Sequence, residues 1–485
     1  MTKLQSLIIL ISYLISFFTV NSQINNLSKT VKNSIDSTYT SLIKKNKVIG
    51  TSIAIVDNGK IVYATGYGFS DLKNEIKADA NTIYGIGSIT KSFTALSIMQ
   101  LQDEKKLKVT NSIKDYLHEL DIENPFGDGN QIYINDILSH TSGLPSDVSN
   151  GFFVDNPPSI SWLIKELNKQ RMISPRQYKF AYSNVGYGLL GELITRVSSI
   201  TYADYLKQNI FAPLNMTSSS IGYELPNTSK TYDKKKETKE PLIRDVAAGF
   251  ISSNVIDLSN YINMLINNGD FNNKQIISSN SVSEMEKDQL ENILLSEPIS
   301  YGYALFQDSI SVKNNIKNDS TIVRLIGHGG DTHAFHADFN YIPELKVGAV
   351  VLTNSVNGSS INSASELLKL YLEKSNDMKV DLDYNTPMSY KGTMPLDDEI
   401  KGKYNFGEML IDVNDLNKIK IKQGLSRIIL TKKPDSYNYS IKAKVFGIIP
   451  VKIKDQEFKF EKLNNEIYIK LKLTENSNEY YLSLI

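Results

Sequence analysis

The chain has 485 residues and contains no cysteine. The absence of thiols excludes a lipid-modified cysteine, a disulfide framework, a thiol nucleophile and a thiolate metal site. The chain also has no excess of charge, because its 53 Lys and Arg residues equal its 53 Asp and Glu residues. Such a balance creates no global field that would attract nucleic acid or an anionic membrane surface. We therefore expect no nucleic-acid partner.

Long apolar runs are also scarce, and the longest lies at the amino terminus, from Leu4 to Val20. At about 17 residues it is shorter than the ~20 that cross a bilayer comfortably. Val20 and Ser22 suit the two positions that precede a signal-peptide cleavage site. We expect a signal peptide at residues 1–22 and an exported protein, periplasmic or secreted. The alternative is an uncleaved anchor, and membrane contact would then occur through this segment alone.

Hydrophobic periodicity predicts the elements of a large first domain. Residues 25–45 have a helical pattern, residues 50–63 alternate as two strands around Asp57-Asn58-Gly59, and residues 88–197 are mostly helical. Strand-like runs return between Val323 and Thr353, and a helix over 363–372 follows. We expect an α/β (α+β) fold class, in which an antiparallel sheet is flanked by helices and joined to an all-helical subdomain.

The last part of the chain differs in character. After a polar stretch it consists of short alternating runs, at 418–422, 437–445, 457–463 and 466–473. These runs predict a small all-β, barrel-like domain. The expected boundaries are 1–22 for the signal peptide, 23–375 for the first domain, 376–395 for a linker and 396–485 for the carboxy-terminal β domain.

Ser88 and Lys91 have the spacing that nucleophilic catalysis uses. They follow the turn Gly85-Ile86-Gly87 and begin an apolar helical pattern, so their side chains would lie one turn apart and could meet. A serine hydroxyl becomes a nucleophile when a base removes its proton, and a lysine sheltered from water can have a pKa low enough to do so. The alternative is a serine N-cap beside an exposed lysine.

Two further segments carry residues suited to proton transfer and substrate binding. Tyr182-Ser183-Asn184 precedes a helical pattern, where a phenol at the edge of a cleft could relay a proton. His328-Gly329-Gly330 ends a predicted strand, where glycine lets a substrate approach the backbone and histidine can donate to it. Each has a structural alternative, namely a packing tyrosine and a strand-end histidine bonded to a nearby carbonyl.

In this order, the three segments resemble the serine-x-x-lysine, tyrosine-x-asparagine and histidine-x-glycine motifs of the class C β-lactamase-like branch of the penicillin-binding protein superfamily. The resemblance covers about residues 25–372. It implies a β-lactamase/transpeptidase-like fold and a serine hydrolase that acts on an amide or ester through an acyl-enzyme, without a cofactor. The substrate would be a small molecule or a peptide, cell-wall peptides included. The carboxy-terminal domain resembles the lipocalin-like barrels that follow such hydrolases.

The resemblance also implies a role for each site residue. Ser88 attacks a carbonyl, and Lys91 and Tyr182 exchange its proton and supply one to the leaving group. Asn184 orients substrate near Lys91. The backbone amides of Ser88 and Asp331 would form the oxyanion hole.

The third motif departs from the pattern of penicillin-recognising members. His328 stands where many of them carry lysine, so a substrate carboxylate loses a permanent positive contact. We expect His328, with Gly330 beside it, to act in substrate binding. His140, in the stretch Leu138–Pro145, is expected to be structural.

Two other functions compete with serine hydrolysis. One is a catalytically inactive binding protein that keeps the hydrolase fold, although three intact motifs argue against it. The other is a metal-dependent hydrolase built on the imidazole and carboxylate groups near the third motif. In an extended strand these groups point to opposite faces, so we expect no metal site. They are His328, Asp331, His333, His336 and Asp338.

Overall fold

The computed structural model describes residues 24–382, apart from 46, 128–130, 149–151, 292, 294–298, 317, 359–362 and 377, together with strands between 402 and 483 as backbone. The described chain divides into two compact units. The larger contains residues 24–176, 181–288 and 301–382, and the smaller contains the carboxy-terminal strands. No helix within these ranges is long and apolar enough to cross a bilayer. The predicted signal peptide lies outside the described residues.

An antiparallel sheet forms the centre of the larger unit. In the described chain its strand order is β1-β3-β2-β18-β17-β16-β15-β14, with β4 paired to β3 and β19 paired to β15. Strands from both ends of the unit therefore meet, because β2 pairs with β18. The strands are β1 (Ile24–Asn25), β2 (Gly50–Asp57), β3 (Lys60–Asp71), β4 (Ile76–Lys77), β14 (Ser300–Tyr301), β15 (Phe306–Asn314), β16 (Asp319–Asp331), β17 (His336–Ile342), β18 (Val347–Thr353) and β19 (Met378–Asp381).

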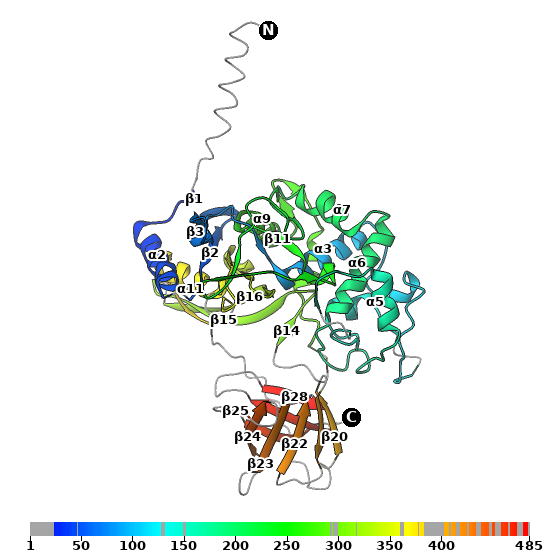
Figure 1. The fold of residues 1–485 in the computed structure, drawn as a ribbon. Coiled ribbons are helices and arrows are strands. Elements are labelled where there is room, and N and C mark those ends of the chain that lie inside the picture. Colours follow the sequence, from blue (N-terminus) through cyan, green and yellow to red (C-terminus); the bar gives the residue numbers. More distant parts are fainter. Residues whose placement is uncertain are drawn as a thin grey trace. The chain divides into compact units, whose positions relative to one another are not determined.

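Helices cover both faces of this sheet (Figure 1). The hairpin between β2 and β3 turns at Asn58 and Gly59, whose φ angles are 47° and 77°, as a tight turn with two left-handed residues requires. Alternate residues of β2 then face opposite sides. Ile53 and Ile55 pack with α2 (Lys29–Lys44) and α11 (Ala364–Ser375), whereas Ala54 and Val56 belong to the core that includes α9 (Val255–Ile266).

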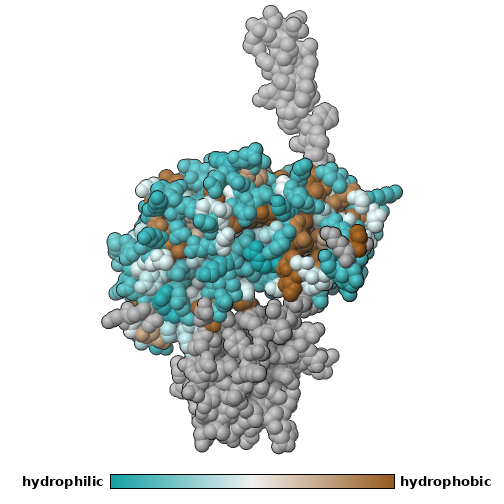
Figure 2. Space-filling view, turned by 180° about the vertical axis from the view of Figure 1, so that it is seen from behind, coloured by the Kyte–Doolittle hydropathy of each residue, from teal (hydrophilic) through white to brown (hydrophobic). Residues whose placement is uncertain are grey.

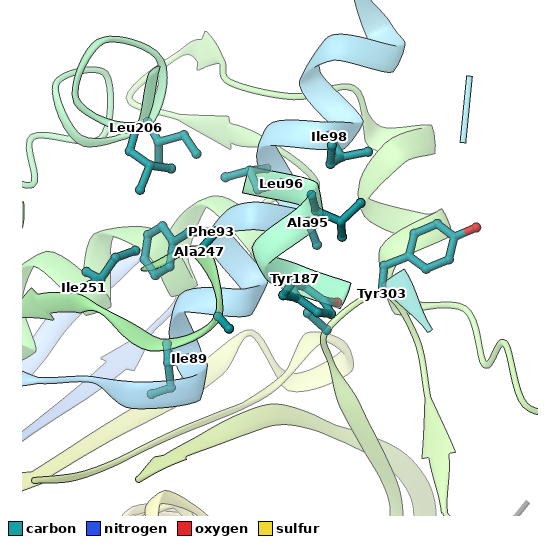
Figure 3. Packing of buried hydrophobic residues seen from close by; sticks show 14 of the residues in the cluster. Ile89, Phe93, Ala95, Leu96, Ile98, Tyr187, Leu206, Ala247, Ile251 and Tyr303 are labelled. Carbon is teal, nitrogen blue, oxygen red and sulfur yellow. The ribbon is translucent and has the colours of Figure 1, made fainter. Parts of the chain in front are cut away.

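A mostly helical part is built around α3 (Thr90–Asp103), which continues from the short 3₁₀ helix η1 (Gly87–Ile89). Every residue of α3 from Thr90 to Leu101 is buried, so the helix lies inside the core rather than on its surface. Figure 3 shows Phe93 and Leu96 of α3 among Tyr187, Leu206 and Ala247 from neighbouring helices. The other helices are α4 (Ile134–Leu138), α5 (Ile160–Leu167), α6 (Asn184–Ser198), α7 (Tyr202–Leu206), α8 (Val246–Gly249) and α10 (Ser279–Glu286).

The smaller unit is an antiparallel sheet with the order β20-β21-β22-β23-β24-β26-β27-β28, to which β25 is added at β24. Its strands curl into a barrel-like sheet in Figure 1. The predicted fold class is thus confirmed for both units. The strands are β20 (Gly402–Phe406), β21 (Met409–Val413), β22 (Lys418–Gln423), β23 (Ser426–Lys432), β24 (Asn438–Val445), β25 (Ile449–Val451), β26 (Glu457–Leu463), β27 (Glu466–Lys472) and β28 (Glu479–Ser483).

The start of the expected linker, 376–395, contributes to the larger unit. β19 pairs with β15 from Ser311 to Asn314, so Met378–Asp381 extends the main sheet. Residues 383–400 lie outside the described chain, and the domain boundaries there stay predictions. Hydrophilic side chains cover most of the coloured face in Figure 2, with apolar residues in smaller groups.

The end of β16 lies against η1 with no space for a side chain between them. A Cβ atom added to Gly330 would lie 1.9 Å from the carbonyl oxygen of Ile86, and one added to Gly87 would lie 2.7 Å from the backbone nitrogen of Asp331. Gly87 also has a φ of 49°, in the left-handed region. These glycines bring the backbone of Asp331 beside Ser88.

We predict that Gly330→Ala lowers the free energy of unfolding by about 1–3 kcal/mol, because the methyl group would force β16 away from η1. Gly329→Ala is the matched control, since its Cβ would lie 4.0 Å from the carbonyl oxygen of Ala337. Its effect should stay within about 0.5 kcal/mol. Urea denaturation of both variants measures the difference. Equal stability of the two variants would contradict the close approach.

Candidate active site

Ser88 and Lys91 meet at the start of α3. The 3₁₀ turn of η1 precedes the helix, and Lys91 Nζ lies 3.2 Å from Ser88 Oγ. Lys91 is fully buried, whereas Ser88 is partly exposed, so a substrate can reach the hydroxyl but not the amine. The alternative of an exposed lysine beside an N-cap serine does not describe this geometry.

Lys91 Nζ contacts three oxygens. Besides Ser88 Oγ, it donates to Asn184 Oδ1 at 2.9 Å and to the carbonyl oxygen of Ala248 at 2.8 Å. The amide and carbonyl oxygens can only accept, so they take the two hydrogens of a neutral amine. The lone pair of the neutral amine is then left for the Ser88 hydroxyl, which can donate to it. This is the arrangement of a general base beside its nucleophile.

The burial of Lys91 favours this neutral form. Loss of water around the amine lowers its pKa to about 7, while the carboxylates of Asp245 and Asp147 act in the opposite direction. Near neutral pH a large share of Lys91 is therefore unprotonated.

Tyr182 lies beside both Ser88 and Lys91. Burial raises the pKa of its phenol above the ordinary value, a hydrogen bond with Ser88 opposes this shift, and the charge of Asp331 adds to it. Lys91 Nζ lies 4.7 Å from the centroid of the Tyr182 ring. The phenol therefore stays protonated near neutral pH, and Tyr182 is suited to donate a proton rather than to accept one first.

His140 holds the segment that carries Tyr182. Its carbonyl oxygen accepts from Ala181 N at 2.7 Å, and its Nδ1 accepts from Ser183 N at 3.1 Å. The His140 and Tyr182 ring centroids lie 4.2 Å apart. Because Nδ1 accepts a backbone N–H, the imidazole is neutral, and burial lowers its pKa well below the ordinary value. His140 positions the Tyr182 segment from both sides.

Asn184 begins α6, and its own position is fixed by two bonds. Ser183 caps the helix, since its Oγ accepts from Gly186 N at 3.0 Å. The backbone N–H of Asn184 donates to the carbonyl oxygen of Ser146 at 3.0 Å. The side chain is therefore directed at Lys91 from a helix start that both bonds hold.

The backbone N–H of Asp331 points towards η1. Thr332 N donates to the carbonyl oxygen of Phe335 at 2.9 Å, so Thr332 and Phe335 form a bonded pair of the β16–β17 hairpin. Bonded and non-bonded pairs alternate in an antiparallel ladder, and Asp331 with His336 is the next pair. The Asp331 N–H thus faces away from β17. It lies on the edge of β16 that β15 does not cover, because the pairing of β15 with β16 ends at Phe306 and Gly327. With the N–H of Ser88, it is suited to bind an oxyanion.

His328 lies inside the site as a neutral imidazole. Burial lowers its pKa to about 3, with the charge of Lys91 acting in the same direction and the backbone contact with Gly329 and the charge of Asp331 opposing it. Its Nδ1 contacts the carbonyl oxygen of Gly329, and its Nε2 has no hydrogen-bond partner among the described residues. Because that carbonyl oxygen can only accept, Nδ1 carries the proton, and the neutral imidazole presents Nε2 as an acceptor without a fixed charge.

The histidines and carboxylates near the third motif do not gather around one point. His336 pairs with Asp331 through Nδ1 and with the carbonyl oxygen of Val356 through Nε2. Asp338 accepts from Ala364 N at 2.8 Å. Within the described residues, no three His, Asp or Glu side chains lie in an arrangement that would hold a metal ion.

A cavity of about 640 Å³ adjoins the turn that follows β16. Tyr223 and Phe335 give it an aromatic wall, and their ring centroids lie 5.9 Å apart. Glu240, also in its lining, accepts from the backbone N–H of His333 at 2.8 Å and so holds the turn. The rest of the cavity lining is mostly polar and charged, with Lys230, Glu237 and Lys239 among its residues.

Sequence reasoning missed four contributors to the site: Ala248, Asp147, Arg244 and Asp245. Ala248 acts through its carbonyl oxygen, which any residue possesses, and the other three form a buried charge cluster from segments about 100 residues apart. Neither kind of contribution leaves a pattern in local sequence.

A family model described as Beta-lactamase matches residues 35–372. Protein flp of Staphylococcus aureus (strain COL) is 28% identical over 344 residues, which cover 68% of this chain and 64% of that protein. The match thus spans less than two thirds of the relative's length.

Two solved structures share the fold. The octameric penicillin-binding protein homologue from Pyrococcus abyssi has a TM-score of 0.58 at 24% identity and covers 93% of this chain and 100% of its own. SurE with D-Leu has a TM-score of 0.68 at 16% identity and covers 94% of this chain and 100% of its own.

We predict that the rate at which a fluorophosphonate modifies Ser88 rises with pH through about 7, because Lys91 must lose its proton to act as the base. Below that pH the rate should fall about tenfold per unit as the ammonium form accumulates. Lys91→Ala should remove this dependence, and Tyr182→Phe should keep it. Rates measured by intact mass from pH 5 to 9 test this, and a flat wild-type profile would contradict it.

Proposed function

Since the chain belongs to the Beta-lactamase family, we propose that it is an exported serine hydrolase that forms an acyl-enzyme at Ser88 with a neutral ester or amide. Proteins of this family are generally serine hydrolases. The observation that carries the proposal is the contact of the buried Lys91 amine with Ser88 Oγ at 3.2 Å, while two other oxygens take its hydrogens. This contact supports general-base activation of the serine.

Acylation starts with proton transfer from Ser88 to neutral Lys91. Ser88 Oγ then forms a bond to the substrate carbonyl carbon, and negative charge develops on the carbonyl oxygen. The backbone N–H groups of Ser88 and Asp331 donate to that oxygen. Neither group has to reorganise, because the contact between β16 and η1 already holds both backbones.

Tyr182 completes the reaction as a proton donor. Its phenol is protonated near neutral pH and bonds to Ser88, so it lies next to the bond that breaks. The leaving alcohol or amine takes its proton from Tyr182, which regains one from the Lys91 ammonium. Water then attacks the ester at Ser88 by the same transfers in reverse.

The neutral His328 favours substrates without a carboxylate beside the scissile bond. Its imidazole is uncharged at neutral pH and presents Nε2 as a hydrogen-bond acceptor, where a lysine would supply a full positive charge. Neutral esters and amides are therefore the substrate class that we propose.

Intact-protein mass spectrometry tests the proposal. The mature protein is exposed separately to a fluorophosphonate, a β-lactam, a panel of neutral esters and a panel of D-amino-acid amides. D-amino-acid amides are included because SurE, a fold neighbour, has been solved with D-Leu. We expect the wild type to gain the mass of the fluorophosphonate adduct at Ser88 and to hydrolyse esters or amides from the panels.

Ser88→Ala is the control, because it removes the nucleophile and leaves the fold intact. It should show neither adduct nor turnover at an unchanged melting temperature. A wild type that reacts with no reagent would favour the inactive binding protein, and turnover in Ser88→Ala equal to wild type would exclude the covalent route.

We further predict that His328→Lys raises kcat/KM for carboxylate-bearing substrates relative to neutral ones. One charge-assisted hydrogen bond should change that ratio by about 1–2 kcal/mol. Matched substrates with and without the carboxylate give the ratio in each variant.

His333→Lys is the matched control, since it adds the same charge at an exposed position of the neighbouring turn. Its ratio should equal that of the wild type. If His328→Lys leaves the ratio unchanged, or lowers turnover equally on both substrates, His328 belongs to the fold or to the catalytic step instead.

A further inference from the structure

Three charged side chains, two of them fully buried, form a cluster next to the start of α8. The Arg244 guanidinium donates to Asp245 through Nε at 3.0 Å and through Nη2 at 2.6 Å, and it also pairs with Asp147. The side chains of Arg244 and Asp245 are 1% and 0% exposed, and that of Asp147 is 29% exposed. Such a cluster is costly to bury, so the fold retains it against a desolvation penalty.

The cluster touches the segments that hold the partners of Lys91. Asp245 directly precedes α8, which supplies the Ala248 carbonyl, and Ala248 N donates to the Asp245 carbonyl oxygen at 2.8 Å. A Cβ atom at Gly188 of α6, one turn beyond Asn184, would lie 3.3 Å from Asp245 Oδ1.

Asp147 adds the third segment. It follows Ser146, whose carbonyl oxygen accepts from the backbone N–H of Asn184 at 3.0 Å. Arg244 therefore connects the loop at 145–148 to the start of α8. Both of these segments also contact α6. The cluster therefore contacts both α6 and α8, which supply the Asn184 and Ala248 oxygens to the Lys91 amine.

We propose that the Asp147–Arg244–Asp245 cluster is a positioning and electrostatic device that sets the protonation state of Lys91, with Asp245 as its principal member. The inference rests on the proposed function, because it concerns the base that activates Ser88. Two carboxylates and one guanidinium leave one excess negative charge behind the amine. That charge stabilises the ammonium form, which burial alone would suppress.

The tyrosine and histidine side chains around Lys91 carry no full charge near neutral pH. The rings of Tyr182 and Tyr187 lie 4.7 and 5.7 Å from Nζ, and their phenols are protonated because burial raises both pKa values. His140 and His328 are neutral because burial lowers theirs. Asp245 and Asp147 are the groups whose charges raise the pKa of Lys91 against its burial.

The pH dependence of Ser88 modification by a fluorophosphonate tests the cluster. In this reaction the Ser88 oxygen forms a bond to phosphorus, the phosphorus–fluorine bond breaks, fluoride leaves, and the serine proton goes to Lys91. Asp245→Asn should move the midpoint of the acidic limb down by about one pH unit. Asp147→Asn should move it in the same direction by less, because Asp147 is partly exposed.

Arg244→Gln should move the midpoint to higher pH, because two carboxylates then face the amine without their counter-charge. Midpoints that move down in Asp245→Asn and up in Arg244→Gln distinguish an electrostatic role from a purely structural one. Loss of a purely structural cluster would lower the rate at every pH without moving the midpoint. Melting temperatures identify variants that fail to fold, and Asp147→Asn keeps the test available if the two buried positions do not tolerate change.

Asp257→Asn is the control for removing a buried carboxylate elsewhere. Asp257 lies on α9 and accepts from Ser218 N and Ser219 Oγ, both at 2.8 Å. Its midpoint should equal that of the wild type. Unshifted midpoints in Asp245→Asn and Asp147→Asn, with a normal wild-type limb, overturn this inference alone. If the fluorophosphonate does not modify Ser88 in the wild type, the proposed function and the inference are overturned together.

Discussion

The burial of one amine is the constraint on which the site depends. Lys91 lies in the buried part of α3, and among the described residues its amine contacts oxygens of Ser88, Asn184 and Ala248. An ammonium in this position would lose its water without a carboxylate in direct contact, so burial favours the neutral amine. A lysine thereby becomes a base at a pH where it would be an acid in water.

The remaining elements supply what this amine requires. Two glycines let β16 lie against η1, which places the Asp331 N–H beside the nucleophile. His140 holds the Tyr182 segment by hydrogen bonds to two of its backbone N–H groups. The Asp147–Arg244–Asp245 cluster connects the loop at 145–148 with α8, next to α6. The active site is therefore shared between the sheet and the helical part, and neither could form it alone.

The sequence was informative where chemistry and local spacing coincide. The turn at Asn58-Gly59, the helical patterns and the pairing of serine with lysine one turn apart are short-range features, and the structure has all of them. The contacts of His140, the Ala248 carbonyl and the Asp147–Arg244 pair join residues far apart in the chain. Local patterns do not encode such contacts, and a carbonyl oxygen has no sequence signature at all.

The central claim is that Lys91 loses its proton near pH 7, and ¹⁵N NMR of protein labelled at lysine Nζ measures this most directly. The Lys91 signal is identified by its absence in Lys91→Met, and its chemical shift is followed from pH 5 to 11. We predict a midpoint of about 7, well below that of exposed lysines. A midpoint near 10, together with the bulk of the lysines, would contradict the account.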